Sequence, residues 1–487
     1  MSVRVSQRGG QSFARQELHY ARIDQLRTRQ MAYEGLMVSV SGVRGRVGDG
    51  LTPEVVARFA AGFGAWARKR SGKDNAIVVV GRDSRVSGPL FHRVVLSALE
   101  SAGCNVMDVG MAPTPTIQLA VEHHHAAGGL AITASHNPIE WNALKFIGPA
   151  GLFLDHAESA EMRAVVDGDI PHVTWDKLGS VDFDPGAIER HQDMILALPF
   201  LDVDGIRRRG FHVALDCVRG AGGAFMPRFL ERLGCRVSAI NLETDGRFPR
   251  SPEPVPENLG DLEGLVKSSG ADVGFAVDPD VDRLALVSNE GRAIGEDYTL
   301  ALAAKVILRY REGPVVTNLS TSRIVEDIAR EQNRQVIRAP VGEVNVATRM
   351  RSEKAAIGGE GNGGVILPEL HLGRDAPVGA ALILQLLHEE SASLSTIVER
   401  YPHYSIVKDK LDRPAAPLDS VYESLKKAFP DAEVDTQDGL RLSWADRWVH
   451  IRPSGTEPIV RVIAEAPSVK EAEALIAKSR APLDALR

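Results

Sequence analysis

The stretch Ala76–Gly81, AIVVVG, is a short apolar run rich in valine that ends on glycine. A run of this length fits a buried strand, whereas a buried helix would need about ten residues or more. Apolar spacing then predicts a helix over Leu90–Ala102, and further apolar runs predict strands over Asn105–Val109 and Gly129–Thr133 around a second helix. Strands that alternate with helices in this way are typical of α/β layers.

The same alternation returns twice further along the chain. One cycle opens with the strand-like HVALDC, His212–Cys217, and reaches another apolar run at Val273–Val277. A third cycle has its first strand over Pro314–Asn318 and ends near Ala356–Gly358. We therefore expect one α/β unit used three times, with the repetition lying in the pattern and not in residue identity.

The last part of the chain follows a different pattern. Four strand-like runs are accompanied by two helical stretches, Leu418–Phe429 after the first run and Val469–Lys478 after the last, which predicts an α+β module with antiparallel character. The four runs are Ile406–Leu411, Gly439–Trp444, Trp448–Arg452 and Ile459–Glu465.

Composition excludes several classes of protein. The 487 residues suggest about three domains, and 44% apolar with 25% charged residues is ordinary for a globular chain. The formal charge of −7 argues against a nucleic-acid binder, and no apolar run is long enough to cross a bilayer. The cysteines, only three and widely spaced, indicate buried thiols in a reducing compartment, the cytoplasm.

The first 36 residues differ from the rest, with six arginines against three acids. They lack the apolar core of a signal peptide, so a targeting role is disfavoured. We expect a disordered tail, or a start codon assigned upstream of Met31 or Met37.

The segment Thr133–Pro138, TASHNP, directly follows the apolar run GGLAI. Ligands of α/β sheets bind where the carboxyl ends of strands open to solvent, so this loop is a candidate site. Ser135 has small neighbours and should offer an accessible hydroxyl, while Asn137-Pro138 favours a turn. Taken alone, the segment is equally compatible with a turn that only caps its own backbone.

A second loop, Asp278–Arg283 (DPDVDR), follows the apolar run VGFAV. Its three alternating acids repel one another unless a cation neutralises them. All-oxygen ligation suits Mg²⁺, and an EF-hand is disfavoured because the glycine and distant glutamate of that loop are missing. The alternative is a solvated acidic turn, which the flanking Val277 and Leu284 disfavour.

Two further loops carry groups suited to a sugar phosphate. In Gly358–Gly364, GGEGNGG, glycine lets the backbone approach a ligand, while Glu360 and Asn362 offer acceptors and donors for hydroxyls. In Arg452–Pro458, RPSGTEP, a guanidinium, hydroxyls and free backbone N–H groups suit a phosphate, and Arg461 could add a second charge. In isolation each loop could also be a polar turn.

Taken in this order, the four loops resemble those of the α-D-phosphohexomutase superfamily. SGVRG at 41–45 and GRDSR at 81–85 resemble its N-terminal motifs, so the resemblance runs from about Val38 to the end. It implies three similar α/β domains around a cleft and a C-terminal α+β domain of TATA-binding-protein-like topology. It also implies phosphoryl transfer between two hydroxyls of one hexose, through a phosphoserine and a hexose 1,6-bisphosphate, with Mg²⁺ as cofactor.

We expect four domains after an N-terminal tail, each with one of the four loops. Residues 1–36 form the tail, 37–170 the domain with the phosphoserine loop, and 171–291 the domain with the metal loop. Residues 292–402 contain the sugar-binding loop, and 403–487 the phosphate-binding loop.

The resemblance also implies roles for individual residues. Ser135 would give and receive the phosphoryl group, and Lys145 would be the general acid/base. Arg44 and His136 would support Lys145, and Arg283 would neutralise the phosphoserine. The implied metal ligands are Ser135, Asp278, Asp280 and Asp282. The implied substrate-binding residues are Glu360 and Asn362 for the sugar hydroxyls, and Arg452, Ser454, Gly455 and Thr456 for the non-reacting phosphate.

One departure bears on the substrate. Many bacterial members end the sugar loop with Ser-Gly-His, where this chain has Asn362-Gly363-Gly364. This form, together with Pro340–Glu343 and His371–Asp375, resembles archaeal-type phosphoglucosamine mutases, which overlap with phosphomannomutase/phosphoglucomutases. The hypothesis is therefore conversion of glucosamine 6-phosphate to glucosamine 1-phosphate, with glucose or mannose phosphates as the alternative.

Two other functional classes use part of the same residue set. A sugar phosphatase would need water to reach the phosphoserine, and a non-catalytic sugar-phosphate-binding protein would not need Ser135, Lys145 and three aspartates together. Beyond the hexose phosphate, neither a nucleic acid nor a membrane is expected as partner. Monomer and homodimer both remain open.

Overall fold

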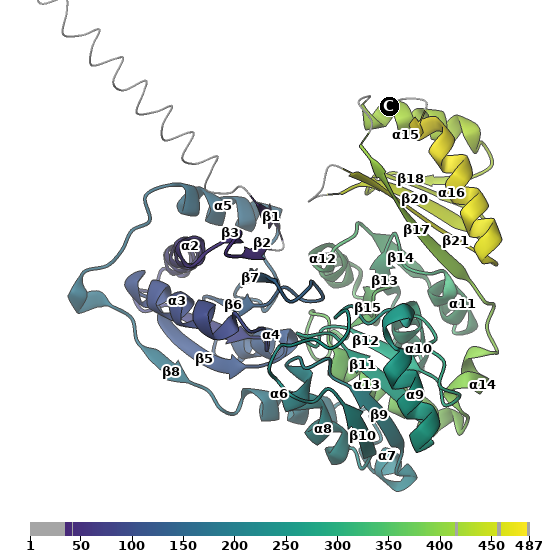
Figure 1. Cartoon of the computed structure of the whole chain (residues 1–487), viewed down its shortest axis with the longest axis horizontal. Helices are drawn as coiled ribbons and strands as arrows, with labels where there is room; N and C mark the ends of the chain where they lie inside the picture. Colours follow the sequence, from purple (N-terminus) through teal and green to yellow (C-terminus); the bar gives the residue numbers. More distant parts are fainter. Residues whose placement is uncertain (1–34, 41, 414–416, 455–458, 485–487) are drawn as a thin grey trace, which may run out of the picture.

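Four sheets, each with its own helices, follow one another along the chain (Figure 1). The computed structural model describes residues 35–40, 42–413, 417–454 and 459–484, so the predicted tail lies almost entirely outside the described residues. Three successive α/β units precede a C-terminal α+β unit. The predicted fold class is confirmed.

The first unit has an eight-stranded sheet of order β1-β2-β7-β6-β4-β5-β8, with β3 beside β2. Its strands are β1 (Leu36–Ser39), β2 (Gly42–Val47), β3 (Gly50–Leu51), β4 (Ile77–Arg82), β5 (Asn105–Met111), β6 (Gly128–Ile132), β7 (Trp141–Ile147) and β8 (Val181–Phe183). Its helices are α2 (Pro53–Ser71), α3 (Gly88–Ser101), α4 (Thr114–His123) and α5 (His156–Asp167). Edge strand β8 lies beyond residue 170 and pairs with β5, so this sheet extends past the expected domain bound.

The second and third units have four-stranded sheets of orders β10-β9-β11-β12 and β14-β13-β15-β16. Their strands are β9 (His212–Asp216), β10 (Arg236–Ile240), β11 (Val273–Val277), β12 (Leu284–Val287), β13 (Val315–Asn318), β14 (Val336–Ala339), β15 (Ile357–Glu360) and β16 (Gly364–Ile366). Their helices are α6 (Ala187–Leu196), α7 (Val203–Arg209), α8 (Gly222–Arg232), α9 (Gly260–Ser269), α10 (Asp297–Ile307), α11 (Ile324–Glu331), α12 (Glu343–Glu353), α13 (Ala376–Glu390) and α14 (Leu394–Val398).

One topology is common to all three units. Three parallel strands are followed by an antiparallel strand: β5-β4-β6-β7, β10-β9-β11-β12 and β14-β13-β15-β16. The three candidate loops TASHNP, DPDVDR and GEGNGG all connect the third of these strands to the fourth. They are therefore the same loop of one repeated unit, at the carboxyl end of a central strand, where α/β sheets bind ligands.

The C-terminal unit is antiparallel throughout. Its sheet order is β17-β21-β20-β19-β18, made by β17 (Ser405–Asp412), β18 (Glu433–Asp435), β19 (Leu440–Ser443), β20 (Trp448–Pro453) and β21 (Ile459–Ala466). Helices α15 (Leu418–Ala428) and α16 (Val469–Asp484) accompany it. It joins the third unit through buried Glu465, which accepts hydrogen bonds from Ser322 Oγ and from the Arg323 N–H.

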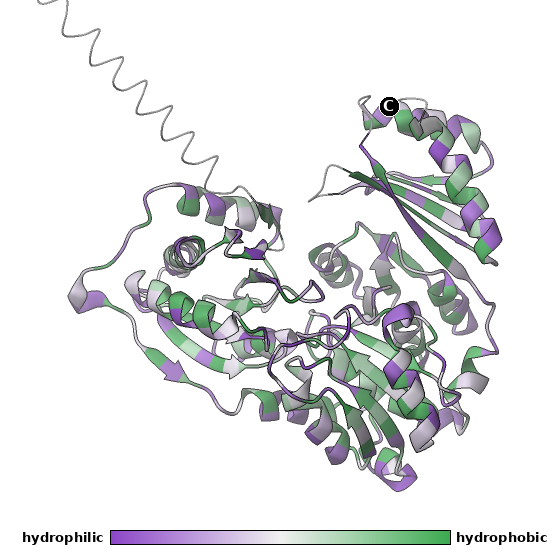
Figure 2. Cartoon of the chain, in the orientation of Figure 1, coloured by the Kyte–Doolittle hydropathy of each residue, from purple (hydrophilic) through white to green (hydrophobic). Residues whose placement is uncertain are grey.

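Hydrophobic residues are frequent in the strands of the sheets (Figure 2). Strands β6 and β11 are buried along their whole length, which is why they appear in the sequence as continuous apolar runs. Among the helices that the structure describes, none has the length and apolar composition that a membrane span requires.

Candidate active site

Ser135 follows β6 in a left-handed backbone conformation, with φ of 48°. Such a conformation costs a non-glycine residue about 1–3 kcal/mol and persists only where its surroundings hold it. Ser135 Oγ donates to Asp278 Oδ2 at 3.0 Å and lies 3.3 Å from His136 Nδ1. The expectation of an accessible hydroxyl is wrong for this conformation, because these neighbours leave Ser135 only 3% exposed.

Arg85 holds the Ser135 loop in shape. Its side chain is completely buried and pairs with Asp83 at 3.1 Å. Its guanidinium also donates to three carbonyl oxygens of the loop, those of Ser135 (2.6 Å), Asn137 (2.6 Å) and Pro138 (2.7 Å), and to that of Trp141 (2.9 Å) at the start of β7. This one side chain therefore supplies hydrogen-bond donors to several backbone carbonyl groups of the turn that contains Ser135.

Replacing Arg85 with methionine should lower the free energy of unfolding by about 3–5 kcal/mol, because Asp83 would remain buried without its cation. Urea denaturation of the full chain measures this loss. The matched control is Arg82→Met, since Arg82 donates one bond, to the Asp83 carbonyl at 2.9 Å, and should cost about 1 kcal/mol. Equal losses in the two variants would show that Arg85 has no special role in this loop.

Asp278, Asp280 and Asp282 lie together after β11, and each is at most 1% exposed. One oxygen from each carboxylate lies within 4.8 Å of the others. The N–H groups of Thr114 and Ala376, at the starts of α4 and α13, donate to backbone carbonyls of this loop at 2.9 and 3.2 Å. Two helix N-termini from different units therefore hold the metal loop in place.

The three carboxylates are incompletely satisfied by protein groups. Burial and the charges of Asp282 and Asp280 raise the pKa of Asp278 well above its usual value. Among the described residues, Asp280 Oδ1 and Asp282 Oδ1 are buried and receive no hydrogen bond. Two unmatched carboxylate oxygens beside a third carboxylate fit a hard divalent cation such as Mg²⁺, which takes oxygen ligands.

Lys145 lies on β7, which returns antiparallel beside β6. Its Nζ donates to Asp280 Oδ2 at 2.7 Å and lies 3.8 Å from Asp282 Oδ2. Burial opposes the ionisation of Asp280, but the charge and the hydrogen bond of Lys145 outweigh it and lower the pKa of that carboxyl. The predicted acid/base therefore contacts the metal loop directly.

Of the other three residues predicted to act in catalysis, His136 and Arg283 belong to these loops and Arg44 comes from β2. Arg44, on β2, donates to Asn137 Oδ1 in the Ser135 loop. Arg283 Nη1 lies 3.4 Å and His136 Nε2 3.8 Å from the same oxygen of Glu253. Burial and the charges of Arg283 and Arg44 lower the pKa of His136 well below its usual value, so its ring is neutral near pH 7.

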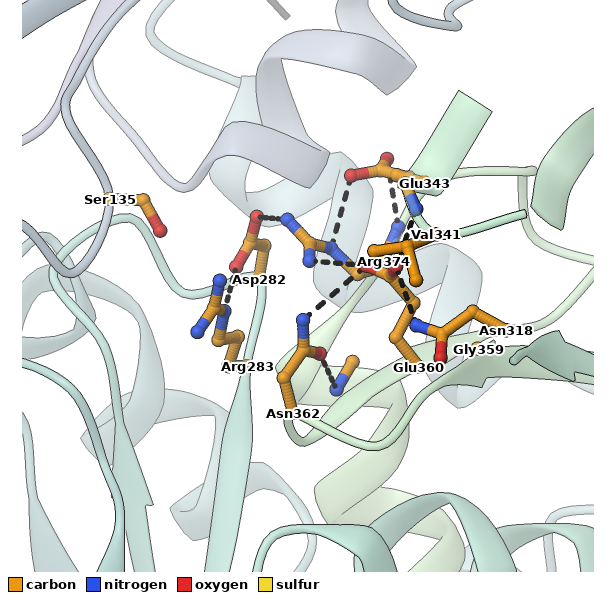
Figure 3. Close-up of polar contacts among 12 residues, drawn as sticks. Ser135, Asp282, Arg283, Asn318, Val341, Glu343, Gly359, Glu360, Asn362 and Arg374 are labelled. Carbon is orange, nitrogen blue, oxygen red and sulfur yellow. Dashed lines mark hydrogen bonds and ion pairs between the residues drawn. The ribbon is translucent and has the colours of Figure 1, made fainter. Parts of the chain in front are cut away.

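The sugar loop packs against the metal loop. The Leu284 N–H donates to the Gly363 carbonyl at 2.9 Å, which joins the start of β12 to the turn between β15 and β16. Glu360 is 3% exposed. Its carboxylate accepts hydrogen bonds from Asn318 Nδ2 (2.9 Å), the Gly342 N–H (3.1 Å), Arg374 Nη1 (2.8 Å) and Asn362 Nδ2 (3.3 Å). The two residues predicted to bind sugar hydroxyls thus lie side by side (Figure 3).

Arg452, the first residue of the phosphate loop, is connected to the segment before α12 through Asp438. Arg452 Nε pairs at 3.0 Å with Asp438 Oδ2, which also accepts a hydrogen bond from the Val341 N–H at 3.0 Å. Arg461 is directly opposite Arg452 in the β20–β21 register, so both side chains lie on one face of the sheet. The other predicted phosphate-binding residues are Ser454, whose N–H donates to a β21 carbonyl at 2.9 Å, and Gly455 and Thr456, which lie outside the described residues.

Known proteins are similar to most of this chain. Family models of phosphoglucomutase/phosphomannomutase domains I, II, III and the C-terminal domain match residues 36–170, 189–291, 295–404 and 406–481. The chain is 37% identical over 447 residues to a probable phosphoglucosamine mutase of Methanopyrus kandleri, covering 91% of this chain and 96% of that protein. It is 38% identical over 452 residues to a phosphoglucomutase/phosphomannomutase of Thermococcus kodakarensis, covering 90% and 96%.

The chain belongs to the phosphoglucomutase/phosphomannomutase family.

A solved structure agrees with this membership. The crystal structure of a phosphoglucomutase/phosphomannomutase family protein from Burkholderia thailandensis matches with a TM-score of 0.79 at 28% identity, covering 92% of this chain and 98% of that one. The predictions of an enzyme and of phosphohexomutase activity are confirmed.

Several polar residues of this phosphohexomutase were missed by sequence reasoning. Arg85, Glu343 and Arg374 lie in motifs that carried the resemblance, but no role was assigned to them. Glu253 and Asp438 lie in no motif. Arg85, Glu343 and Arg374 could have been noticed as charged residues inside these motifs, because a buried charge needs a partner.

Proposed function

We propose that this phosphohexomutase interconverts hexose 6-phosphate and hexose 1-phosphate through a phosphoserine at Ser135 and a hexose 1,6-bisphosphate. One observation carries the proposal: Ser135 Oγ is 3.0 Å from Asp278, inside a buried carboxylate cluster that also holds Lys145 at 2.7 Å. A structural serine would not need three carboxylates and a lysine around it, whereas a serine that exchanges a phosphoryl group does.

In the proposed first transfer, the oxygen of a sugar hydroxyl forms a bond to the phosphorus on Ser135, and the bond from phosphorus to Ser135 Oγ breaks. Lys145 takes the proton from the hydroxyl, and a proton returns to Ser135 Oγ. The second transfer is the reverse reaction with the other phosphate of the bisphosphate, which restores the phosphoserine. No water is consumed, which distinguishes this sequence from phosphatase chemistry.

The charge of the transferred group requires neutralisation from several directions. Mg²⁺ held by Asp278, Asp280 and Asp282 would supply two positive charges at the phosphoryl oxygens. Arg283 would add a third. Arg452 would hold the phosphate that does not react, at whichever end of the sugar it stands. Because Ser135 is 3% exposed here, the units must move apart for substrate to enter, as is common in enzymes that enclose their substrate.

For the substrate we propose glucosamine phosphate. The sugar side of the site is acidic: Glu343 and Glu360 are both buried and share a single guanidinium, that of Arg374. Such an excess of carboxylate favours a substrate that carries an ammonium group. The similarity to the protein of Methanopyrus kandleri points the same way, while that to the protein of Thermococcus kodakarensis keeps glucose and mannose phosphates as the alternative.

A panel of three sugar phosphates tests this proposal. We expect kcat/KM for glucosamine 6-phosphate to exceed the values for glucose and mannose 6-phosphates by about tenfold or more, which corresponds to about 1.4 kcal/mol. All three are assayed with one bisphosphate activator. A large preference for glucose or mannose phosphate would overturn the substrate and leave the mutase standing. Inactivity toward all three would contradict the proposed reaction.

We also propose that the protein works in the cytoplasm. Cys104, Cys217 and Cys235 are all buried and free, and burial raises the pKa of Cys104 to about 11. Buried thiols of this kind suit a reducing compartment.

A further inference from the structure

Arg374 lies at the centre of the site, between β16 and α13, and is 8% exposed. Its guanidinium contacts three carboxylates, which come from the loop after β11, the end of β15 and the start of α12 (Figure 3). Nη2 donates to Asp282 Oδ2 at 2.6 Å, Nη1 donates to Glu360 Oε2 at 2.8 Å, and Nε lies 3.0 Å from Glu343 Oε2. The planar fork of an arginine fixes the angles between such partners in a way that a lysine ammonium does not.

The contact between Arg374 and Asp282 determines which oxygen of the Asp282 carboxylate is hydrogen-bonded and which is not. Oδ2 is taken by Arg374, and Lys145 Nζ stands 3.8 Å from the same oxygen. Oδ1 receives no hydrogen bond from any described residue, although Arg283 Nε lies 3.8 Å away. Arg374 therefore orients the Asp282 carboxylate so that one defined oxygen is left for a cation.

The contact with Glu360 connects this metal loop to the sugar loop. Asp282 belongs to the second α/β unit and Glu360 to the third, and two nitrogens of one guanidinium hold both. If Glu360 moves when it binds a sugar hydroxyl, the rigid Arg374 guanidinium would transmit that movement to Asp282. Glu343, at the start of α12, is the third carboxylate that contacts the Arg374 guanidinium.

The sugar loop is built around this arginine. A Cβ at Gly364 would lie 2.3 Å from Arg374 Cδ and 2.9 Å from Cγ, both closer than nonbonded carbon atoms can approach. Glycine at 364 therefore leaves the space that the arginine side chain crosses. A substitution at Gly364 therefore offers a second way to disturb the contacts of Arg374, because it displaces the arginine without removing it.

We propose that Arg374 is a positioning residue that couples magnesium binding at Asp282 to sugar binding at Glu360. The inference rests on the proposed function, since it assigns the metal to one of these carboxylates and the sugar to the other. Coupling between two ligands is reciprocal: sugar phosphate tightens magnesium binding by the same factor by which magnesium tightens sugar-phosphate binding. Factors of about 5 to 150 are typical of such coupling.

The test measures binding, without turnover, by isothermal titration calorimetry. Mg²⁺ is titrated into the full chain in a Ser135→Ala background, with and without saturating glucosamine 6-phosphate. We expect the sugar phosphate to tighten Mg²⁺ binding by about fivefold or more. Adding Arg374→Lys should weaken Mg²⁺ binding by about 10- to 100-fold, the usual cost of losing a group that orients a metal ligand. The coupling factor should fall to near one. Gly364→Ala should give the same signature.

Arg338→Lys is the matched control. Arg338 is also an arginine of the third unit whose side chain is only 8% exposed, paired with Glu326 at 2.6 Å and with the carbonyls of Asn318 and Thr321. It should lose stability on substitution while Mg²⁺ affinity and the coupling factor stay unchanged. A wild-type coupling factor of one, or unchanged coupling in both Arg374→Lys and Gly364→Ala, would overturn the role of Arg374.

Steady-state kinetics distinguish a failure of the proposed role of Arg374 from a failure of the proposed mutase reaction. In the Ser135-containing chain, Arg374→Lys should raise both the Mg²⁺ activation constant and KM for the sugar phosphate. A wild-type enzyme inactive toward all three sugar phosphates would count against the proposed function. An active wild type whose binding coupling survives Arg374→Lys would count against Arg374 alone.

Discussion

Replacing Ser135 with alanine should abolish mutase turnover, with kcat falling by a factor on the order of 10⁴ to 10⁶, as when other enzymes lose a covalent nucleophile. The hydroxyl is the only group that the substitution removes. Its 3.0 Å contact with Asp278 places it in the carboxylate cluster. A coupled assay with added bisphosphate measures the loss. Magnesium affinity should change far less than kcat, because the three aspartates remain.

Ser159→Ala is the control for the general effect of losing a buried serine. Ser159 lies on α5 in the same unit, is 8% exposed, and stands outside the loops of the site. It should keep wild-type kcat. Activity in Ser135→Ala equal to that of Ser159→Ala would remove the phosphoserine from the mechanism.

Replacing Asp280 with asparagine should weaken magnesium binding by at least about 100-fold and lower kcat at limiting magnesium accordingly. Loss of a group that only orients a ligand costs about 10- to 100-fold in metal affinity, so loss of a direct ligand should cost at least as much. The substitution keeps size but removes one charge, and it also weakens the partner of Lys145, now 2.7 Å away. Calorimetric titration of Mg²⁺ into chelator-treated protein measures the change.

Asp216→Asn provides the matched control. Asp216 also ends a central strand of the second unit, is 1% exposed and pairs with Arg250 at 2.6 Å, but lies outside the metal loop. It should lose stability without changing magnesium affinity. If Asp280→Asn bound magnesium as tightly as Asp216→Asn, the acidic loop would be structural and not a metal site.

Strands were predictable where burial leaves a continuous apolar run. The run at Val273–Val277 is β11 to the residue, and Ala76–Gly81 is displaced by one residue from β4. Strand β8 gave no such signal, because its side chains are exposed. It becomes a strand only through its pairing with β5, which the sequence does not reveal.

The candidate loops were predictable because polar residues follow apolar strands, but their contacts were not. Ser135 and Asp278 are 143 residues apart, and Arg374 and Asp282 are 92 apart. These contacts depend on how the repeated units pack against one another, which local sequence pattern does not encode. The burial of Ser135 escaped prediction for the same reason, since the residues that cover it include Asp278 from the next unit.

Peptide mass spectrometry can show whether Ser135 carries the phosphoryl group. The purified chain is incubated with Mg²⁺ and hexose 1,6-bisphosphate, quenched and digested. We expect one phosphoryl group per chain, mapped to Ser135 and absent from Ser135→Ala. It should be lost when the phosphorylated enzyme, freed of bisphosphate, is treated with excess hexose 6-phosphate, which takes up the phosphoryl group as bisphosphate. Phosphorylation mapped to another residue, or full turnover by a chain that never carries phosphate at Ser135, would contradict it.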